Sequence, residues 1–157
     1  MHKLVYPFSV LVLAGSLFAA DPFAGTWKLN VAKSKFGGPD PSPKELTVVI
    51  EDQGERAAVT GKGTASDGSP ISNKYTVIKT GGEANYSEGA PPPGVSVVFP
   101  KRKADTNTAV STTMKDGKVL ETTRGVVSGD GKTMRLTVKG TDAQGKPFES
   151  VQVFDKQ

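Results

Sequence analysis

The sequence predicts an all-β protein in which a single antiparallel up-and-down meander closes into a barrel of about nine to ten strands. The ordered-looking stretches alternate apolar and polar residues and are rich in Val, Thr and Ile, while 18 glycines and 11 prolines interrupt them at short intervals. Tight turns such as Asp116-Gly117 join consecutive stretches, which favours neighbouring antiparallel strands. An open meander would expose two strand edges, so we expect it to close on itself.

The first 20 residues are expected to form a secretory signal peptide. Lys3 supplies a positive start, an apolar run ends at Phe18, and Ala19-Ala20 offers small residues for cleavage before Asp21. The apolar run is shorter than the ~20 residues that a membrane-spanning helix needs. We therefore expect an exported protein, periplasmic or extracellular, with one barrel domain over residues 21–157 and no membrane span.

The first predicted strand opens with Gly25-Thr26-Trp27, where the glycine allows a tight turn and the only tryptophan plugs one end of the barrel. A Pro-rich loop over residues 32–43 follows, because closely spaced prolines exclude a helix or a central strand. A second stiff loop is expected at Pro91–Pro93. The predicted strands are 25–31, 44–52, 56–64, 71–80, 83–88, 95–101, 107–115, 118–127, 132–140 and 148–156.

Alternation within these strands predicts which side chains form the inner wall of the barrel. The residues expected there are Leu46, Val48, Ile50, Tyr75, Val77, Met134, Leu136 and Val138. The chain also contains an internal echo, since Lys62-Gly63-Thr64 with Gly68 and Pro70 matches Lys139-Gly140-Thr141 with Gly145 and Pro147 at a constant offset of 77 residues. A repeated strand–turn–strand–turn–strand unit fits a pseudo-symmetric barrel, although similar hairpins can also recruit similar turn residues.

Composition excludes several kinds of site. The chain has no cysteine, and its single histidine, His2, belongs to the signal peptide. Triads that need His or Cys and typical zinc sites are therefore excluded from the barrel, and we predict no cofactor and no metal. The net charge of +4 is small and scattered, which argues against a nucleic-acid partner. The aspartates Asp67, Asp116, Asp130 and Asp142 are interpreted as turn formers.

Three interpretations of Arg124 are open. If it shares the inner face with Leu120, it is an anchor for an anionic ligand, or it packs over the indole of Trp27 in a cation–π contact. If instead the face of Val119 and Val127 points inward, Arg124 is solvated.

The segment Gly25-Thr26-Trp27-Lys28-Leu29, preceded by Phe23, resembles the opening of the lipocalin and fatty-acid-binding protein superfamily. Residues 151–156 are similar to the last strand of the intracellular fatty-acid binders. Residues 21–157 as a whole resemble secreted bacterial lipocalin-like proteins of unknown function. The shared features are Gly25–Asn30 with Lys33-Ser34 and Phe36, Asp116-Gly117-Lys118, Asp130-Gly131-Lys132-Thr133, and Gly140-Thr141 with Gly145-Lys146. The resemblance implies a calycin-type barrel. It does not extend to the Arg-x-Tyr pair that holds a carboxylate in fatty-acid binders, because Gln152 and Phe154 occupy those places.

The leading hypothesis is a non-catalytic, monomeric carrier of a small apolar or amphipathic molecule. Its predicted ligand-binding residues are Trp27, Tyr75, Leu120, Arg124, Leu136 and Phe154. The alternative is an interaction or inhibitor module that acts through its Pro-rich loops and has a filled barrel. A hydrolase that uses Glu121 and Glu149 is a third option, and it requires both carboxylates in one cleft. An internal cavity of ~300 Å³ or more would separate the first two hypotheses.

Overall fold

The computed structural model describes residues 20–103 and 106–157, and the predicted signal peptide lies outside these residues apart from Ala20. The strands are β1 (Gly25–Leu29), β2 (Pro43–Asp52), β3 (Arg56–Ala65), β4 (Pro70–Ile78), β5 (Gly82–Glu83), β6 (Asn85–Glu88), β7 (Val95–Phe99), β8 (Thr108–Lys115), β9 (Lys118–Val127), β10 (Thr133–Thr141) and β11 (Pro147–Lys156). One short 3-10 helix, η1 (Val31–Lys33), follows β1. The described part of the chain contains no helix long and apolar enough to cross a membrane.

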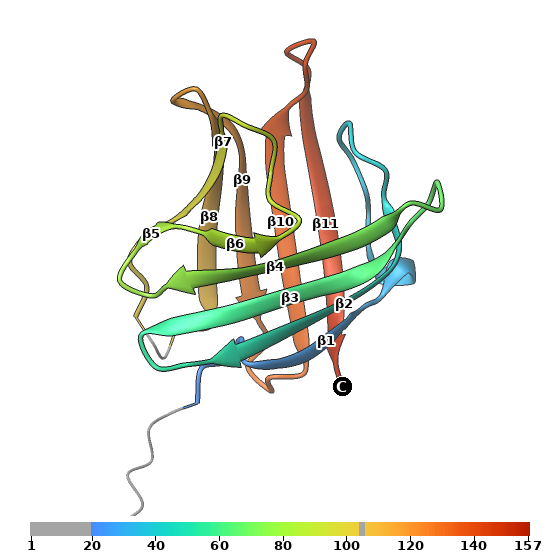
Figure 1. Ribbon diagram of the computed structural model, residues 1–157. Coiled ribbons are helices and arrows are strands. Elements are labelled where there is room, and N and C mark those ends of the chain that lie inside the picture. The colour runs from blue at the N-terminus through green and yellow to red at the C-terminus, as the bar shows by residue number, and fades with distance from the viewer. Residues whose placement is uncertain (1–19, 104–105) are drawn as a thin grey trace, which may run out of the picture.

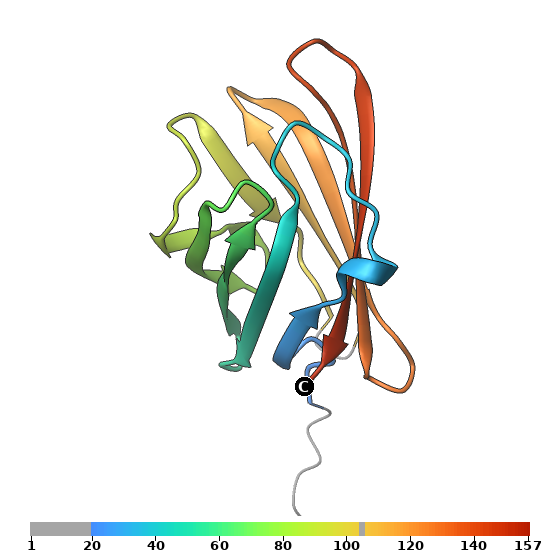
Figure 2. The ribbon, with the colours of Figure 1, turned by 90° about the vertical axis from the view of Figure 1, so that its right-hand side faces the viewer.

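All strands belong to one antiparallel sheet of 11 strands, in the order β5-β7-β8-β9-β10-β11-β1-β2-β3-β4-β6. The sheet curls into a nearly closed barrel (Figure 1). After a quarter turn, β2–β4 form one wall and β8–β11 the other (Figure 2). The predicted all-β meander is therefore confirmed.

The structure has one strand more than the list of predicted strands, because the predicted strand 83–88 is split. β5 pairs with β7, whereas β6 pairs with β4. Between them the backbone N–H of Ala84 donates to the carbonyl of Val97, 2.8 Å away. This bridging segment, residues 82–88, thus crosses from one wall of the barrel to the other.

The two walls are also joined where the first and last strands pair. We call these two junctions, the crossing from β5 to β6 and the pairing of β1 with β11, the seams of the barrel. β1 and β11 are antiparallel neighbours, with Trp27 opposite Lys156 and Leu29 opposite Phe154. The Pro-rich loop begins with η1 and then follows β11, where Lys35 forms an isolated bridge with Val151. In Figure 2 this loop runs along β11 and rises to one end of the barrel.

The internal echo corresponds to equivalent parts of the sheet. A shift of 77 residues moves β2, β3 and β4 onto β9, β10 and β11 to within a few residues at every end. Each triplet is a continuous antiparallel meander. The predicted strand–turn–strand–turn–strand unit is therefore present twice, once in each wall.

Candidate ligand-binding cavity

The barrel encloses a cavity of about 480 Å³. It exists because several inward positions carry small side chains, which leave the interior unfilled. On β3, Ala57 and Gly61 face the cavity, and on the opposite wall Ala109 and Gly125 do so. At Gly125 an added Cβ would lie 2.9 Å from Cδ2 of Leu136, so a larger residue here would require Leu136 to shift.

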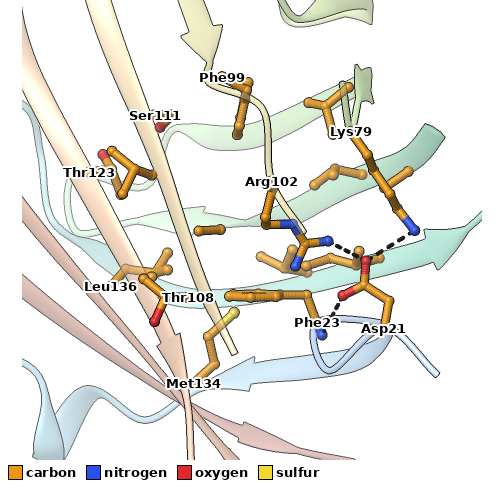
Figure 3. A pocket seen from close by; sticks show the side chains of 18 of the residues that line it. Asp21, Phe23, Lys79, Phe99, Arg102, Thr108, Ser111, Thr123, Met134 and Leu136 are labelled. Carbon is orange, nitrogen blue, oxygen red and sulfur yellow. Dashed lines mark hydrogen bonds and ion pairs between the residues drawn. The ribbon is translucent and has the colours of Figure 1, made fainter. Parts of the chain in front are cut away.

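Most of the cavity wall is apolar, and the predicted inner face is largely correct. The predicted residues that line the cavity are Leu46, Val48, Ile50, Tyr75, Val77, Met134 and Leu136, whereas Val138 lies further along, beside a smaller recess. Ser111 and Thr123 add hydroxyl groups, and Asn73 and Gln152 add amides. Figure 3 shows Ser111 and Thr123 at the left of the view, away from the charged side chains of Asp21, Lys79 and Arg102 at the right. These neutral polar groups give a ligand hydrogen-bonding partners within an apolar surface.

One end of the cavity rests on the hydrophobic core. Trp27, Val127 and Phe154 are fully buried there, and Phe23 and Met134 pack with them. The indole N–H of Trp27 donates to the carbonyl of Phe23, 2.8 Å away, so the buried polar atom is satisfied. Phe154 lines the cavity, whereas Trp27 lies outside the lining. Trp27 therefore belongs to the core behind the cavity wall, contrary to the prediction that it is a ligand-binding residue.

The same end carries a charged cluster, made of Asp21, Arg102, Lys79 and Asp52. The Asp21 carboxylate accepts hydrogen bonds from the Arg102 guanidinium and from the Phe23 N–H, and it lies 3.2 Å from Nζ of Lys79 (Figure 3). Lys79 also pairs with Asp52. The Arg102 guanidinium stacks over the Phe23 ring, 5.0 Å from its centroid. The cluster thus ties the chain before β1 to the connections after β4 and β7.

The electrostatic balance in this cluster favours an ionised Asp21. Its side chain is only 2% exposed, and burial by itself would raise the pKa of the carboxyl group. The hydrogen bonds from Arg102 and the Phe23 N–H, together with the nearby positive charge of Arg102, outweigh burial and lower the pKa below 3.8. The pKa of Asp52 is lowered as well, chiefly by its hydrogen bond with Lys79.

Tyr75 is the predicted site residue that the structure places most clearly on the wall. It lies on β4, lines the cavity, and packs against Tyr86 of β6 with ring centroids 4.9 Å apart. Burial, with a smaller contribution from Tyr86, raises the pKa of Tyr75 to about 12. The phenol is therefore neutral at physiological pH and able to donate a hydrogen bond.

Besides Trp27, two further predicted site residues do not line the cavity. Arg124 and Leu120 both lie on the outer face of β9 and are exposed. The expectation that they face a ligand is wrong, because Thr123 and Gly125 occupy the inner face of this strand. The solvated interpretation of Arg124 is the one that the structure bears out. The cation over the Trp27 indole is Lys156, with Nζ 5.1 Å from the ring centroid.

The two candidate hydrolytic carboxylates lie on opposite faces of the sheet. Glu121 faces a recess of about 150 Å³ beneath the Pro-rich loop, where its carboxylate accepts a hydrogen bond from the Thr113 hydroxyl, 3.2 Å away. Glu149 is exposed and pairs with Lys139. They do not share a cleft, so the paired-carboxylate hypothesis has no support. Asp67, Asp130 and Asp142 each accept backbone N–H groups within their own turns, as predicted.

Comparisons with known proteins add little to this site. No protein-family model matches the chain, and no curated protein matches it significantly. Among solved structures it is similar to a de novo designed fluorescence-activating β-barrel, at 16% sequence identity and a TM-score of 0.39, over 88% of this chain and 97% of that chain. A similarity of this degree carries no information about function.

Proposed function

We propose that this protein is an exported, non-catalytic carrier that binds a small apolar or amphipathic molecule inside its barrel. The observation that supports the proposal is the cavity of about 480 Å³, whose wall is mainly apolar with a few hydroxyl and amide groups. Its volume falls within the roughly 300–1,000 Å³ of typical small-molecule sites. The alternative, an interaction module with a filled barrel, is less favoured because side chains leave this interior open.

Kinship with the lipocalin and fatty-acid-binding superfamily is part of the same proposal. Its support is the Gly25-Thr26-Trp27 opening, which here starts the first strand of a nearly closed meander and buries its tryptophan completely. Export rests on the pattern of residues 1–20. It is tested by the intact mass of the protein recovered from the periplasm of a bacterial host, which should correspond to residues 21–157.

Binding inside the barrel is tested with a neutral apolar dye, Nile red, and a series of linear alcohols that displace it. Each additional buried methylene contributes about 0.8 kcal/mol, so affinity should rise about fourfold per methylene until the cavity is full. Leu136→Trp, on the inner face of β10, should abolish binding by filling the cavity. Arg135→Trp, the next residue on the outer face, is the matched control and should bind normally.

The result that contradicts the proposal is equal binding by both variants, because it would place the dye on the outer surface. Failure of every alcohol to displace the dye would contradict it as well. If the proposal is correct, native mass spectrometry of the protein purified from its own host should reveal the natural ligand as a co-purifying small molecule.

A further inference from the structure

We propose that the ligand is an amphiphile with an anionic head group, bound with the head at the charged cluster and the chain along the barrel. This inference rests on the proposed function and adds the chemical class and orientation of the ligand. It follows from the distribution of charge along the cavity.

Among residues 20–103 and 106–157, the charged side chains that line the cavity all lie where the chain segment before β1 meets the connections after β4 and β7. The charged lining residues are Asp21, Lys79, Lys101, Arg102 and Lys103. Of these described residues four are cationic and one is anionic, a surplus of three positive charges among residues 20–103 and 106–157 at this end. Counting Asp52, which pairs with Lys79 from outside the lining, still leaves a surplus of two. Such a concentration of one sign attracts an anion and repels a cation.

The members of this group have different roles. Asp21 engages Arg102 and Lys79, whose side chains are only 16% and 10% exposed, so these three groups hold the end of the barrel together. Lys101 and Lys103, the rim lysines, are exposed and form no ion pair with any carboxylate of residues 20–103 and 106–157. The surplus of positive charge therefore resides mainly on two side chains whose substitution leaves the cluster intact.

The rest of the cavity has the opposite character. Beyond the cluster the wall consists of apolar side chains with neutral groups such as Ser111, Thr123 and Gln152. Gln152 is shared with the smaller recess, where Glu121 provides a negative charge. An anionic head group would meet this carboxylate at the Gln152 end and cations at the Arg102 end. Charge therefore orients an anionic amphiphile in one direction only.

The inference is tested by displacing Nile red with ligands that have the same chain and different heads: laurate, monododecyl phosphate, dodecanol and dodecyltrimethylammonium, all below their micellar concentrations. We expect both anions to bind more tightly than the alcohol and the ammonium compound to bind least. A preference between laurate and the phosphate identifies the head group, and either preference supports the inference. Added salt should weaken the binding of the two anions and leave the binding of the alcohol unchanged, because salt screens interactions between exposed charges.

The decisive variant is Lys101→Gln with Lys103→Gln. This double variant should lower the affinity for laurate about three- to tenfold and leave the affinity for dodecanol unchanged, since each exposed charge contact contributes modestly to binding. The matched control, Arg124→Gln with Arg135→Gln, removes the same net charge from the outer face of β9 and β10 and should leave both affinities unchanged.

Equal binding of laurate and dodecanol would overturn the inference and leave the proposed function intact. So would an equal loss of laurate affinity in the two double variants, which would indicate a general charge effect. If no compound displaces the dye, the proposed function itself fails.

Discussion

Replacing Asp21 with asparagine should destabilise the barrel through one end only. The substitution keeps the size of the side chain and an oxygen that accepts from the Phe23 N–H, 3.0 Å away. It removes the negative charge that Arg102 and Lys79 share. Lys79 keeps its ion pair with Asp52, whereas Arg102 loses its ion pair with Asp21.

The magnitude follows from burial. Removing one partner of a fully buried ion pair costs about 3–5 kcal/mol. Arg102 and Lys79 are 16% and 10% exposed and recover some hydration, and the asparagine oxygen keeps one hydrogen bond. We therefore expect the free energy of unfolding near pH 7 to fall by about 2–3 kcal/mol.

The effect should depend on pH with a defined sign. Because the pKa of Asp21 is lowered by folding, its ionisation stabilises the protein at pH values above the ordinary 3.8, and this contribution is lost as pH falls through the lower, folded-state value. Urea unfolding of the protein and of Asp21→Asn should thus give a difference that is constant from near pH 7 to about pH 5 and shrinks toward about pH 2.

Asp67→Asn is the matched control, since Asp67 is an exposed turn residue, and its effect should be the smaller of the two. Equal stability of Asp21→Asn and the unaltered protein near neutral pH would refute the reasoning. A difference that persisted unchanged to about pH 2 would also refute it, because it would then come from packing and not from charge.

Three further substitutions test the wall and the core. Because the pKa of Tyr75 is raised to about 12, its neutral form stabilises the fold below the ordinary value of 10.0, and this stability is lost as pH rises toward about 12. Tyr75→Phe should therefore reduce the fall in the free energy of unfolding with rising alkaline pH. An unchanged dependence of that free energy on pH would contradict the prediction. Trp27→Phe should cost about 2–3 kcal/mol in chemical unfolding, since it leaves a void and a carbonyl without its donor. Gly63→Ala should cost about 1–3 kcal/mol because the added Cβ would strike the Glu45 carbonyl oxygen, whereas Gly129→Ala, with open space around it, should be neutral in the same assay.

The sequence is informative about the sheet because the signals for its strands are local. Alternation over Leu46, Val48 and Ile50 reports an inner face directly, and a glycine in a tight turn such as Gly117, at φ 78°, marks where a strand ends. These signals need only a few neighbouring residues, so the antiparallel barrel and most strand boundaries could be predicted.

The inner face of β9 could not be predicted in the same way. Two of its inward residues, Thr123 and Gly125, are polar or small and only Val127 at its end is apolar, whereas the outward Leu120 and Val126 are apolar. Gly125 faces inward beside Leu136 and Phe23, and a glycine adds nothing to a hydrophobic pattern. Hydrophobic alternation therefore fails to identify the inner face of a strand whose inward side chains are small or polar and so leave space for a cavity.

The charged cluster was missed for a different reason. Asp21 and Arg102 are 81 positions apart; Asp21 lies in the segment before β1 and Arg102 in the connection after β7, and the sequence alone gives neither charge a partner. Only the order of the strands in the sheet brings these two segments together. The one available signal was the basic run Lys101-Arg102-Lys103 directly after an apolar strand, which marks a concentration of charge but not its partner.

The two seams make the barrel asymmetric in how it can come apart. At the β5–β6 seam the chain itself crosses the gap, so the walls stay tethered there even if hydrogen bonds break. At the β1–β11 seam nothing covalent joins the strands, and partners such as Leu29 and Phe154 are separated by almost the whole domain. The ring can therefore be completed only after its last strand has been made, and during synthesis the unfinished sheet has an open edge that needs protection from other chains.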